Sequence, residues 1–256
     1  MTEDTVFTST EWVNQIPVVH LHGVLDARSY MQVRNTIVKA ATDSPDAVLV
    51  VVDDLSVPTE SAWTVLTSSS WLIRQWPGIP LSVVSNSSDR RERLTRNGIA
   101  RYLPIHPGVE DALAEIRAGR NSSPVRVRVR HHRPRTEAGL AEMRELVTDT
   151  LRDWGHPECV PAARCISSVL SGNVLRHTDS DLDMRVEMRG DLVTIAMQDG
   201  SPAPAVLREE SADPGTYVSG LAILAALSQA WGSVPSEDGK TVWSVMGPEN
   251  YLPMYR

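Results

Sequence analysis

The sequence predicts a two-domain protein of the α/β class. Its 256 residues exceed the usual domain size of roughly 100 to 200 residues, so the chain has room for two domains. Short β-branched runs alternate with longer segments of helical periodicity, the pattern of α/β folds. Residues 117–135 carry seven arginines and no acid, and begin with a cluster of Gly, Asn, Ser and Pro that is typical of a boundary. We therefore predict domains over 1–122 and 123–256.

The first half alternates strand-like and helix-like segments. Its strands are short and β-branched, as expected for the buried strands of a small mixed sheet, and Asp26 stands where a helix N-cap belongs. The predicted strands cover 18–25, 46–52 and 80–84. The predicted helices cover 27–41, 60–76, 89–97 and 109–117.

The second half opens with a strand over 125–130 in which valine and arginine alternate, so we expect buried valines on one face and arginines on the other. Amphipathic periodicity then predicts helices over 136–154 and 161–177. Two strands, 182–189 and 192–197, meet at Gly190-Asp191 in a hairpin. A helix over 220–231 and a strand over 241–246 complete the domain.

Composition and charge exclude several classes of protein. Uninterrupted apolar runs such as Ala47 to Val52 are far shorter than the about 20 residues of a membrane span, and the N-terminus lacks the features of a signal peptide. The two cysteines support neither a disulfide framework nor a zinc site. We expect a cytoplasmic protein that has no membrane partner.

A nucleic-acid partner is also disfavoured. The net charge is −7, and the only local basic patch is the arginine segment beside His131 and His132. No aromatic residues interleave there for base stacking, so we interpret this segment as a strand edge and linker.

Common catalytic motifs are missing. The dinucleotide-binding Gly-x-Gly-x-x-Gly loop does not occur, and no nucleophile elbow or zincin helix is present. Gly239-Lys240-Thr241 imitates the end of a P-loop, but Val234 stands where a glycine is needed and a strand follows instead of a helix. His20 and His22 have metal-ligand spacing on one strand, yet no third ligand is in view, so we expect solvated histidines.

Residues 14–118 resemble a STAS domain of the anti-sigma factor antagonist type. The resemblance rests on the order and spacing of three segments, Gly23 to Asp26, Asp53 to Ser56, and Asn97 to Ile105. In that family an anti-sigma kinase phosphorylates a serine at the start of the helix after the second acidic strand, which switches partner binding off. The resemblance therefore implies Ser61 as the phosphorylation site. It also implies a partner-binding surface of Asp26, Asp54, Glu60, Ser61 and Trp63.

Ser61 has two interpretations. The backbone N–H groups of a helix N-terminus tolerate a phosphate, whose charge would repel a partner at a dry interface. Serine is also a common N-cap, so Ser61 could simply cap its helix without regulation. The local sequence departs from the family, because Glu60 replaces its Asp and Trp63 replaces a small residue. A bulky indole there could hinder a kinase or anchor a partner.

Residues 125–248 resemble the GHKL-type ATPase domain of anti-sigma factor serine kinases. Four segments occur in the family's order: Asn173 to His177, Asp199 to Pro204, Gly220 to Leu224, and Gly239 to Trp243. The resemblance implies an α/β sandwich that binds ATP and Mg²⁺. Its nucleotide-binding candidates are Asn173, Asp199, Gly220, Lys240 and Thr241, and Asn173 is the candidate for Mg²⁺.

Two departures from this family concern catalysis. The position of the family's base, a glutamate one turn before the Asn, holds Val169, and loss of a general base typically costs on the order of 10² to 10⁴ in rate. The lid segment Gly215 to Gly220 retains two glycines but lacks the family's Gly-Arg-Gly triplet. We therefore predict a degenerate, catalytically inactive ATPase-like domain.

Together these features predict an anti-sigma factor antagonist-type regulator in partner-switching control of transcription. Its STAS domain would bind an anti-sigma factor or switch-protein kinase, and its own second domain is a further candidate partner. One alternative is an active ATP-dependent protein serine kinase, which acts as an anti-sigma factor and has recruited another base. The other alternative is a structural adaptor that binds no nucleotide.

Overall fold

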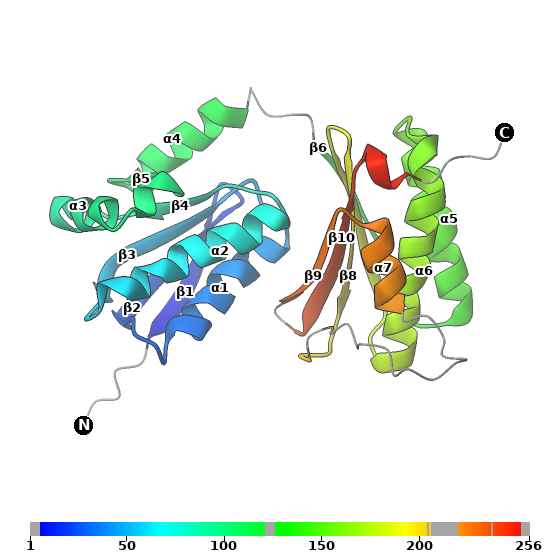
Figure 1. Cartoon of the computed structure of the whole chain (residues 1–256), viewed down its shortest axis with the longest axis horizontal. Coiled ribbons are helices and arrows are strands. Elements are labelled where there is room, and N and C mark those ends of the chain that lie inside the picture. Colours follow the sequence, from blue (N-terminus) through cyan, green and yellow to red (C-terminus); the bar gives the residue numbers. More distant parts are fainter. Residues whose placement is uncertain (1–5, 121–125, 204, 206–219, 237, 252–256) are drawn as a thin grey trace. The chain divides into compact units, whose positions relative to one another are not determined.

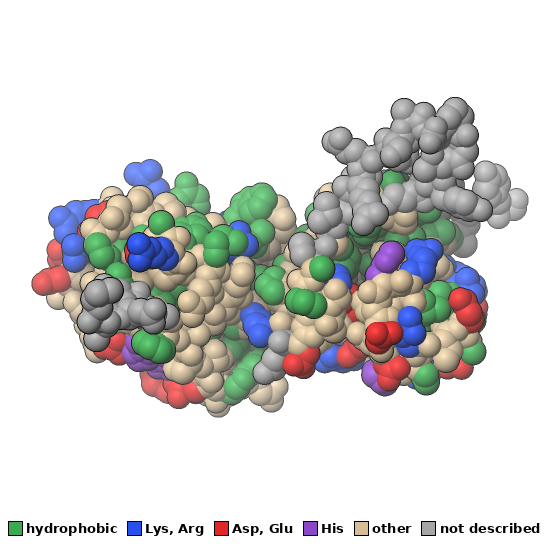
Figure 2. Space-filling view, turned by 90° about the horizontal axis from the view of Figure 1, so that it is seen from below, with side chains coloured by type: hydrophobic (Ala, Val, Ile, Leu, Met, Phe, Trp, Pro, Cys, Tyr) green, Lys and Arg blue, Asp and Glu red, His purple; other side chains and the backbone are tan. Residues whose placement is uncertain are grey.

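The computed structural model describes residues 6–120, 126–203, 205, 220–236 and 238–251 (Figure 1). The chain divides into two compact units, Met1–Ser123 and Pro124–Arg256, and each unit has a five-stranded sheet of its own. No helix among the described residues is long and apolar enough to cross a membrane. Acidic and basic side chains are interspersed on the face shown in Figure 2, without a large field of one sign.

The first unit is built on a mixed sheet with the strand order β1-β2-β3-β4-β5. β1 pairs antiparallel with β2, and the remaining neighbours pair in parallel. The strands are β1 (Phe7–Val13), β2 (Ile16–Val24), β3 (Val48–Ser56), β4 (Leu81–Val84) and β5 (Ile105–His106). This arrangement confirms the predicted mixed sheet.

Helices cover both faces of this sheet. Val18 and Leu49 pack with Leu113 of α4, while the alternate residues Val19 and Val50 are equally buried toward the layer of α1 and α2. Burial on both faces explains why the strands read as continuous apolar runs. The helices are α1 (Tyr30–Thr42), α2 (Thr64–Gln75), α3 (Ser88–Arg96) and α4 (Val109–Arg120), with short 3₁₀ turns η1 (Glu60–Trp63) and η2 (Ile99–Arg101).

Three details of the first unit differ from the sequence-based expectation. The strands β1 and β5 were not expected, because most residues of β1 are polar and β5 has only two residues. The predicted N-cap at Asp26 is wrong, since the N-cap of α1 is Ser29. The Asp26 carboxylate instead accepts hydrogen bonds from the N–H groups of Arg28 and Ser29, and so forms the turn that precedes the helix.

The second unit has an antiparallel sheet with the strand order β6-β7-β8-β10-β9. Its three helices lie on one face of the sheet (Figure 1). The strands are β6 (Arg126–Arg133), β7 (Leu182–Arg189), β8 (Leu192–Asp199), β9 (Ala230–Pro235) and β10 (Lys240–Met246). The helices are α5 (Glu137–Asp153), α6 (Val160–His177) and α7 (Gly220–Leu227), with 3₁₀ turns η3 (Pro157–Cys159) and η4 (Pro248–Asn250).

The core of this unit lies between the helices and the sheet. Ile166 and Leu170 of α6 pack there with Met184 of β7 and Ile195 of β8. The predicted hairpin is present, since β7 and β8 pair in continuous register around Gly190.

Two predictions for the second unit are wrong. The helix expected over 220–231 ends at Leu227, where the apolar run also ends; Ser228 and Gln229 follow, and β9 begins at Ala230 and pairs with β10. The valines of β6 are not uniformly buried, since this strand lies at the sheet edge and Val127 is 36% exposed. Its arginines form bidentate ion pairs, Arg126 with Glu187 and Arg130 with Asp183.

We predict opposite effects of alanine at two glycines of this unit. A Cβ at Gly239 would overlap the carbonyl oxygen of Asp199, whereas one at Gly172 in α6 would make only ordinary contact with Arg176. Gly239→Ala should therefore lower the free energy of unfolding by about 2 kcal/mol or more. Gly172→Ala should raise it by about 0.5 to 1 kcal/mol, because glycine weakens a helix interior. Urea unfolding of the full chain checks both, and equal effects would contradict the placement of Gly239.

Candidate functional site

Polar side chains collect where the parallel strands β3 and β4 end. Ser85 donates a hydrogen bond of 2.6 Å to the Asp53 carboxylate, and the N–H of Asn86 donates to both oxygens of that carboxylate at 3.0 and 3.1 Å. Asp53 therefore ties the end of β3 to the segment that follows β4. A carboxylate bonded in this way has a structural role.

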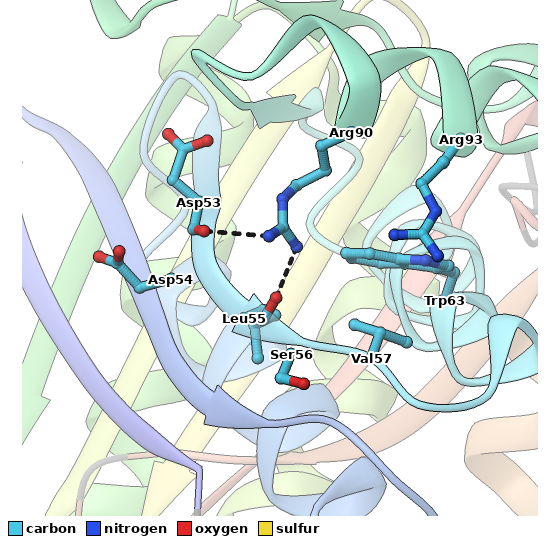
Figure 3. A pocket seen from close by; sticks show the side chains of 8 residues that line it. All are labelled: Asp53, Asp54, Leu55, Ser56, Val57, Trp63, Arg90 and Arg93. Carbon is cyan, nitrogen blue, oxygen red and sulfur yellow. Dashed lines mark hydrogen bonds between the residues drawn. The ribbon is translucent and has the colours of Figure 1, made fainter.

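An open pocket of about 440 Å³ lies beside this junction (Figure 3). Arg90 of α3 crosses its base and donates to the carbonyl oxygens of Leu55 at 2.6 Å and Asp53 at 3.1 Å. The Trp63 side chain forms an apolar part of the wall and is itself 3% exposed. The remaining lining residues are Asp54, Ser56, Val57 and Arg93.

Glu60 and Ser61 follow the pocket along the chain. The Glu60 carboxylate forms an ion pair of 3.0 Å with Arg93 and accepts a hydrogen bond from the Asn97 amide. These contacts hold the 3₁₀ turn η1 against α3. Ser61 lies exposed in that turn, and among the described residues its hydroxyl has no hydrogen-bond partner.

The interpretation of Ser61 as a helix cap is wrong. The N-cap residue of η1 is Thr59 and that of α2 is Trp63, and neither position has a side-chain cap hydrogen bond. The only hydrogen bond at Ser61 uses its backbone carbonyl, which accepts from the Thr64 hydroxyl at 2.7 Å. The serine hydroxyl is therefore not committed to holding the helix.

Asp26 and Asp54 lie at the same edge of the sheet. Leu25, which precedes Asp26, donates its N–H to the Ser56 carbonyl at 2.9 Å, so the ends of β2 and β3 are adjacent. Backbone hydrogen bonds from Ser29 and then Arg28 lower the pKa of Asp26. The Asp54 side chain is 70% exposed and pairs with His22 at 3.1 Å. The sequence-predicted surface residues thus come from neighbouring strand ends and from η1.

Sequence reasoning missed Arg90 and Arg93. Both arginines follow Ser61 by about 30 residues, with α2 and β4 in between. Two arginines three residues apart on a helix are usually interpreted as part of its solvent-exposed face. Their part in the pocket follows from the packing of α3 beside the end of β3. The sequence carries no signal for that contact.

The histidines of β2 do not form a metal site among the described residues. His20 pairs with Glu11 at 3.0 Å while His22 pairs with Asp54, and the two rings stack with centroids 6.4 Å apart. Another group of potential ligands, His156, Glu158 and Cys159, has its ligand atoms within 4.8 Å of one another. Burial raises the pKa of the Cys159 thiol, which disfavours the thiolate that a metal needs.

In the second unit, Asn173 and Gly220 come together. A Cβ at Gly220, the first residue of α7, would lie 3.6 Å from the Asn173 Oδ1 atom and 3.2 Å from Val169. Arg176, one turn along α6, donates to that oxygen at 3.2 Å. The Gly215 to Ser219 part of the predicted lid lies outside the described residues.

Asp199 and Lys240 form a second pair. They lie opposite each other at the ends of β8 and β10, and the Lys240 Nζ atom is 2.8 Å from the Asp199 Oδ1 atom. The N–H of Ser201 donates to the same oxygen at 2.8 Å. Both side chains are largely buried. Thr241 follows Lys240 in the strand, so its side chain lies on the other face of the sheet and does not join this pair.

The described residues do not fit Mg²⁺ and ATP well. The Asn173 oxygen accepts from a cationic guanidinium, which disfavours a second cation there. Lys240 donates to Asp199 Oδ1 and to the Ser201 carbonyl oxygen, so a phosphate would have to compete with these groups for the ammonium. Val169 cannot act as a base, and the neighbouring Ser168 hydroxyl donates to the Arg164 carbonyl at 2.8 Å.

The sequence matches no family model and no curated protein. Among solved structures, an anti-sigma factor antagonist from Mycobacterium paratuberculosis is 20% identical over 45% of this chain and 97% of that chain, with a TM-score of 0.40. A variant of RsbS from Moorella thermoacetica is 19% identical over 44% of this chain and 97% of that chain, with a TM-score of 0.38. The phosphorylated Bacillus cell fate determinant SpoIIAA is 18% identical over 43% and 99%, with a TM-score of 0.33. The first half of the chain thus resembles anti-sigma factor antagonist structures.

We predict that the contributions of Asp199 and Lys240 to the free energy of unfolding of the second unit are coupled, because each buried charge needs the other. Lys240→Met should cost about 3 kcal/mol, because it leaves a buried carboxylate without its partner. The double variant Asp199→Asn, Lys240→Met should recover a large part of that loss. Hydrogen exchange in β8 and β10 under native conditions measures the change.

The exposed pair Arg133–Glu142 supplies the control, and Arg133→Met should cost less than about 1 kcal/mol. A double variant as unstable as the sum of its two single variants would contradict the coupling.

Proposed function

We propose that this chain is a regulator in partner-switching control of transcription. It binds an anti-sigma factor or a switch-protein kinase with the surface around Ser61 in its first unit. The observation that carries the proposal is the state of Ser61, which lies exposed at the first turn before α2 and makes no side-chain hydrogen bond to another described residue. It stands between the Glu60–Arg93 ion pair and the buried Trp63.

This location suits a phosphate-controlled contact. A phosphoserine carries about −1.5 to −2 charges at pH 7. Placed beside Glu60, that charge competes for the Arg93 guanidinium, whose side chain is 57% exposed and therefore within reach of solvent and ligands. Phosphorylation would exchange one ion pair for another at the edge of the pocket, and would add charge to a surface that a partner must desolvate.

The surface itself has the parts of a protein-binding site. It combines the exposed Asp54 carboxylate, the guanidinium of Arg93 and the apolar wall at Trp63 in one open pocket. A partner segment that carries a basic side chain next to an apolar one would complement it, since charged groups at a rim and an apolar anchor at the centre are the usual division of an interface.

We propose that the second unit does not transfer phosphate. Three groups argue against it: Val169 at the position of the family's base, Arg176 bonded to Asn173, and Lys240 bonded to Asp199. The rival functions, an active serine kinase and an adaptor without nucleotide binding, differ from the proposal in measurable ways that the following experiments separate.

Substitution of Ser61 tests the proposed surface. Ser61→Asp should weaken binding to a cognate anti-sigma factor at least about tenfold, because the added carboxylate repels the partner and disturbs the Glu60–Arg93 pair. Ser61→Ala should leave binding within about twofold, since the hydroxyl makes no contact in the free protein. Calorimetry against each anti-sigma factor kinase encoded in the same genome provides the measurement.

Thr36→Asp on α1 adds the same charge away from this surface and serves as the control. If Ser61→Asp and Thr36→Asp bind every candidate partner as the unmodified chain does, the proposed surface is wrong.

Incubation with nucleotide tests the proposal for the second unit. The full chain incubated with Mg²⁺ and ATP should phosphorylate neither its own Ser61 nor a separate STAS-type substrate, because the described residues supply no base at position 169. Phosphoserine mass spectrometry over a time course measures this. Phosphoserine that forms at enzyme-like rates and disappears in Asp199→Asn would establish the kinase and overturn the proposal for the second unit.

A further inference from the structure

β1 lies at an edge of its sheet, and natural proteins usually protect such edges from pairing with other chains. It is one of the two edge strands of the first unit and pairs with β2 through seven consecutive residue pairs without a register shift. Phe7 and Trp12, which are 67% and 58% exposed, both lie on this strand. An exposed edge strand that presents large apolar side chains is a template for pairing with another chain.

The free backbone groups of β1 can be assigned from its hairpin. Val13 and Ile16 flank the two-residue turn Asn14-Gln15, in which both residues have positive φ, and such a flanking pair exchanges both hydrogen bonds. Hydrogen-bonded pairs alternate along an antiparallel ladder. Thr8, Thr10 and Trp12 therefore direct their N–H and C=O groups away from β2, and they make no backbone hydrogen bond to another described residue.

The other sheet edges of the described residues carry protective features. β5 is only two residues long, β6 has a row of arginines, and β9 contains Gly232 and ends at Pro235. Short strands, charged side chains and proline are the usual means of blocking edge pairing. β1 has no proline, lysine or arginine, and its one acid, Glu11, pairs within the sheet with His20.

We propose that β1 binds β1 of a second copy of this chain, antiparallel, across a two-fold axis at Thr10. In this register Thr10 faces Thr10 of the second copy, and Thr8 faces its Trp12. Each of these hydrogen-bonding pairs exchanges both backbone hydrogen bonds, so the free groups of the edge are used. The two sheets become one continuous sheet.

The side chains fit this self-pairing. Phe7 lies across from Val13 of the second copy, and Trp12 covers its Thr8, so apolar surface meets apolar or small side chains. Glu11 lies across from Ser9 of the second copy and does not face another Glu11. The two-fold register therefore avoids the like-charge contact that would exclude a homodimer.

One edge pairing buries less area than the roughly 1,200 to 2,000 Å² of a stable complex. We expect a reversible dimer with a dissociation constant in roughly the micromolar range. The dimer does not depend on the function proposed for Ser61, because β1 and η1 are separate elements.

Sedimentation equilibrium of the full chain over a wide concentration range tests the dimer. Trp12→Lys should weaken dimerisation at least about tenfold, because a charged side chain blocks edge pairing. Trp71→Lys, at a tryptophan of α2 that is 61% exposed, is the matched control and should change it less than about twofold. Thr10→Pro should also abolish the dimer while the fold remains, since its N–H points outward.

Cross-linking tests the register. In a Cys165→Ser background, which removes the exposed free cysteine, Thr10→Cys should form a disulfide-linked dimer, since paired strands bring these residues to about 5.5 Å. Thr8→Cys should not, because it faces Trp12 of the second copy. A chain that stays monomeric at every concentration, a dimer insensitive to both Trp12→Lys and Thr10→Pro, or cross-linking at Thr8 equal to that at Thr10 would overturn the proposal.

Discussion

The candidate site of the first unit depends on how the end of β3 is held. Asp53 accepts hydrogen bonds from Ser85 and Asn86, and Arg90 donates to the carbonyl oxygens of Asp53 and Leu55. These contacts satisfy backbone and side-chain groups where the sheet pairing of β3 with β4 has ended. The segment from Leu55 to Trp63 consequently has a defined position, and the pocket, Glu60 and Ser61 are placed by it.

Carboxylates and basic side chains differ in exposure between the two candidate sites. Around Ser61 the carboxylate of Asp54 and the guanidinium of Arg93 are solvent-accessible, so their charges can interact with another molecule at little desolvation cost. In the second unit the charges of Asp199 and Lys240 are buried against each other. The two members of a buried ion pair stay together, because separating them would leave each charge unpaired in an interior that solvates charge poorly. This difference in exposure is why the proposed partner-binding surface lies in the first unit.

Much of the architecture could be predicted because its signals are local. The β-branched run over 46–52, the amphipathic helix over 161–177 and the hairpin at Gly190 each carry their pattern within a few residues. The expected helix over 220–231 was wrong in its second part for the opposite reason. Residues 228–231, Ser-Gln-Ala-Trp, are too few and too mixed to show a helical or a strand period, and only the pairing of β9 with β10 decided between the two. β1 was missed because a polar edge strand has little apolar alternation.

The sequence by itself determined the α/β class and most element positions, because these follow from residue type and local period. Tertiary structure decided which charged and polar side chains are exposed and which are bonded to other parts of the chain. Arg90 reaches the end of β3 from α3, Lys240 meets Asp199 from a different strand, and Ser61 lies outside the cap positions of its helix. The reason is physical: hydrogen bonds and ion pairs depend on distance in space, and residues far apart in the chain share no pattern that reveals such contacts.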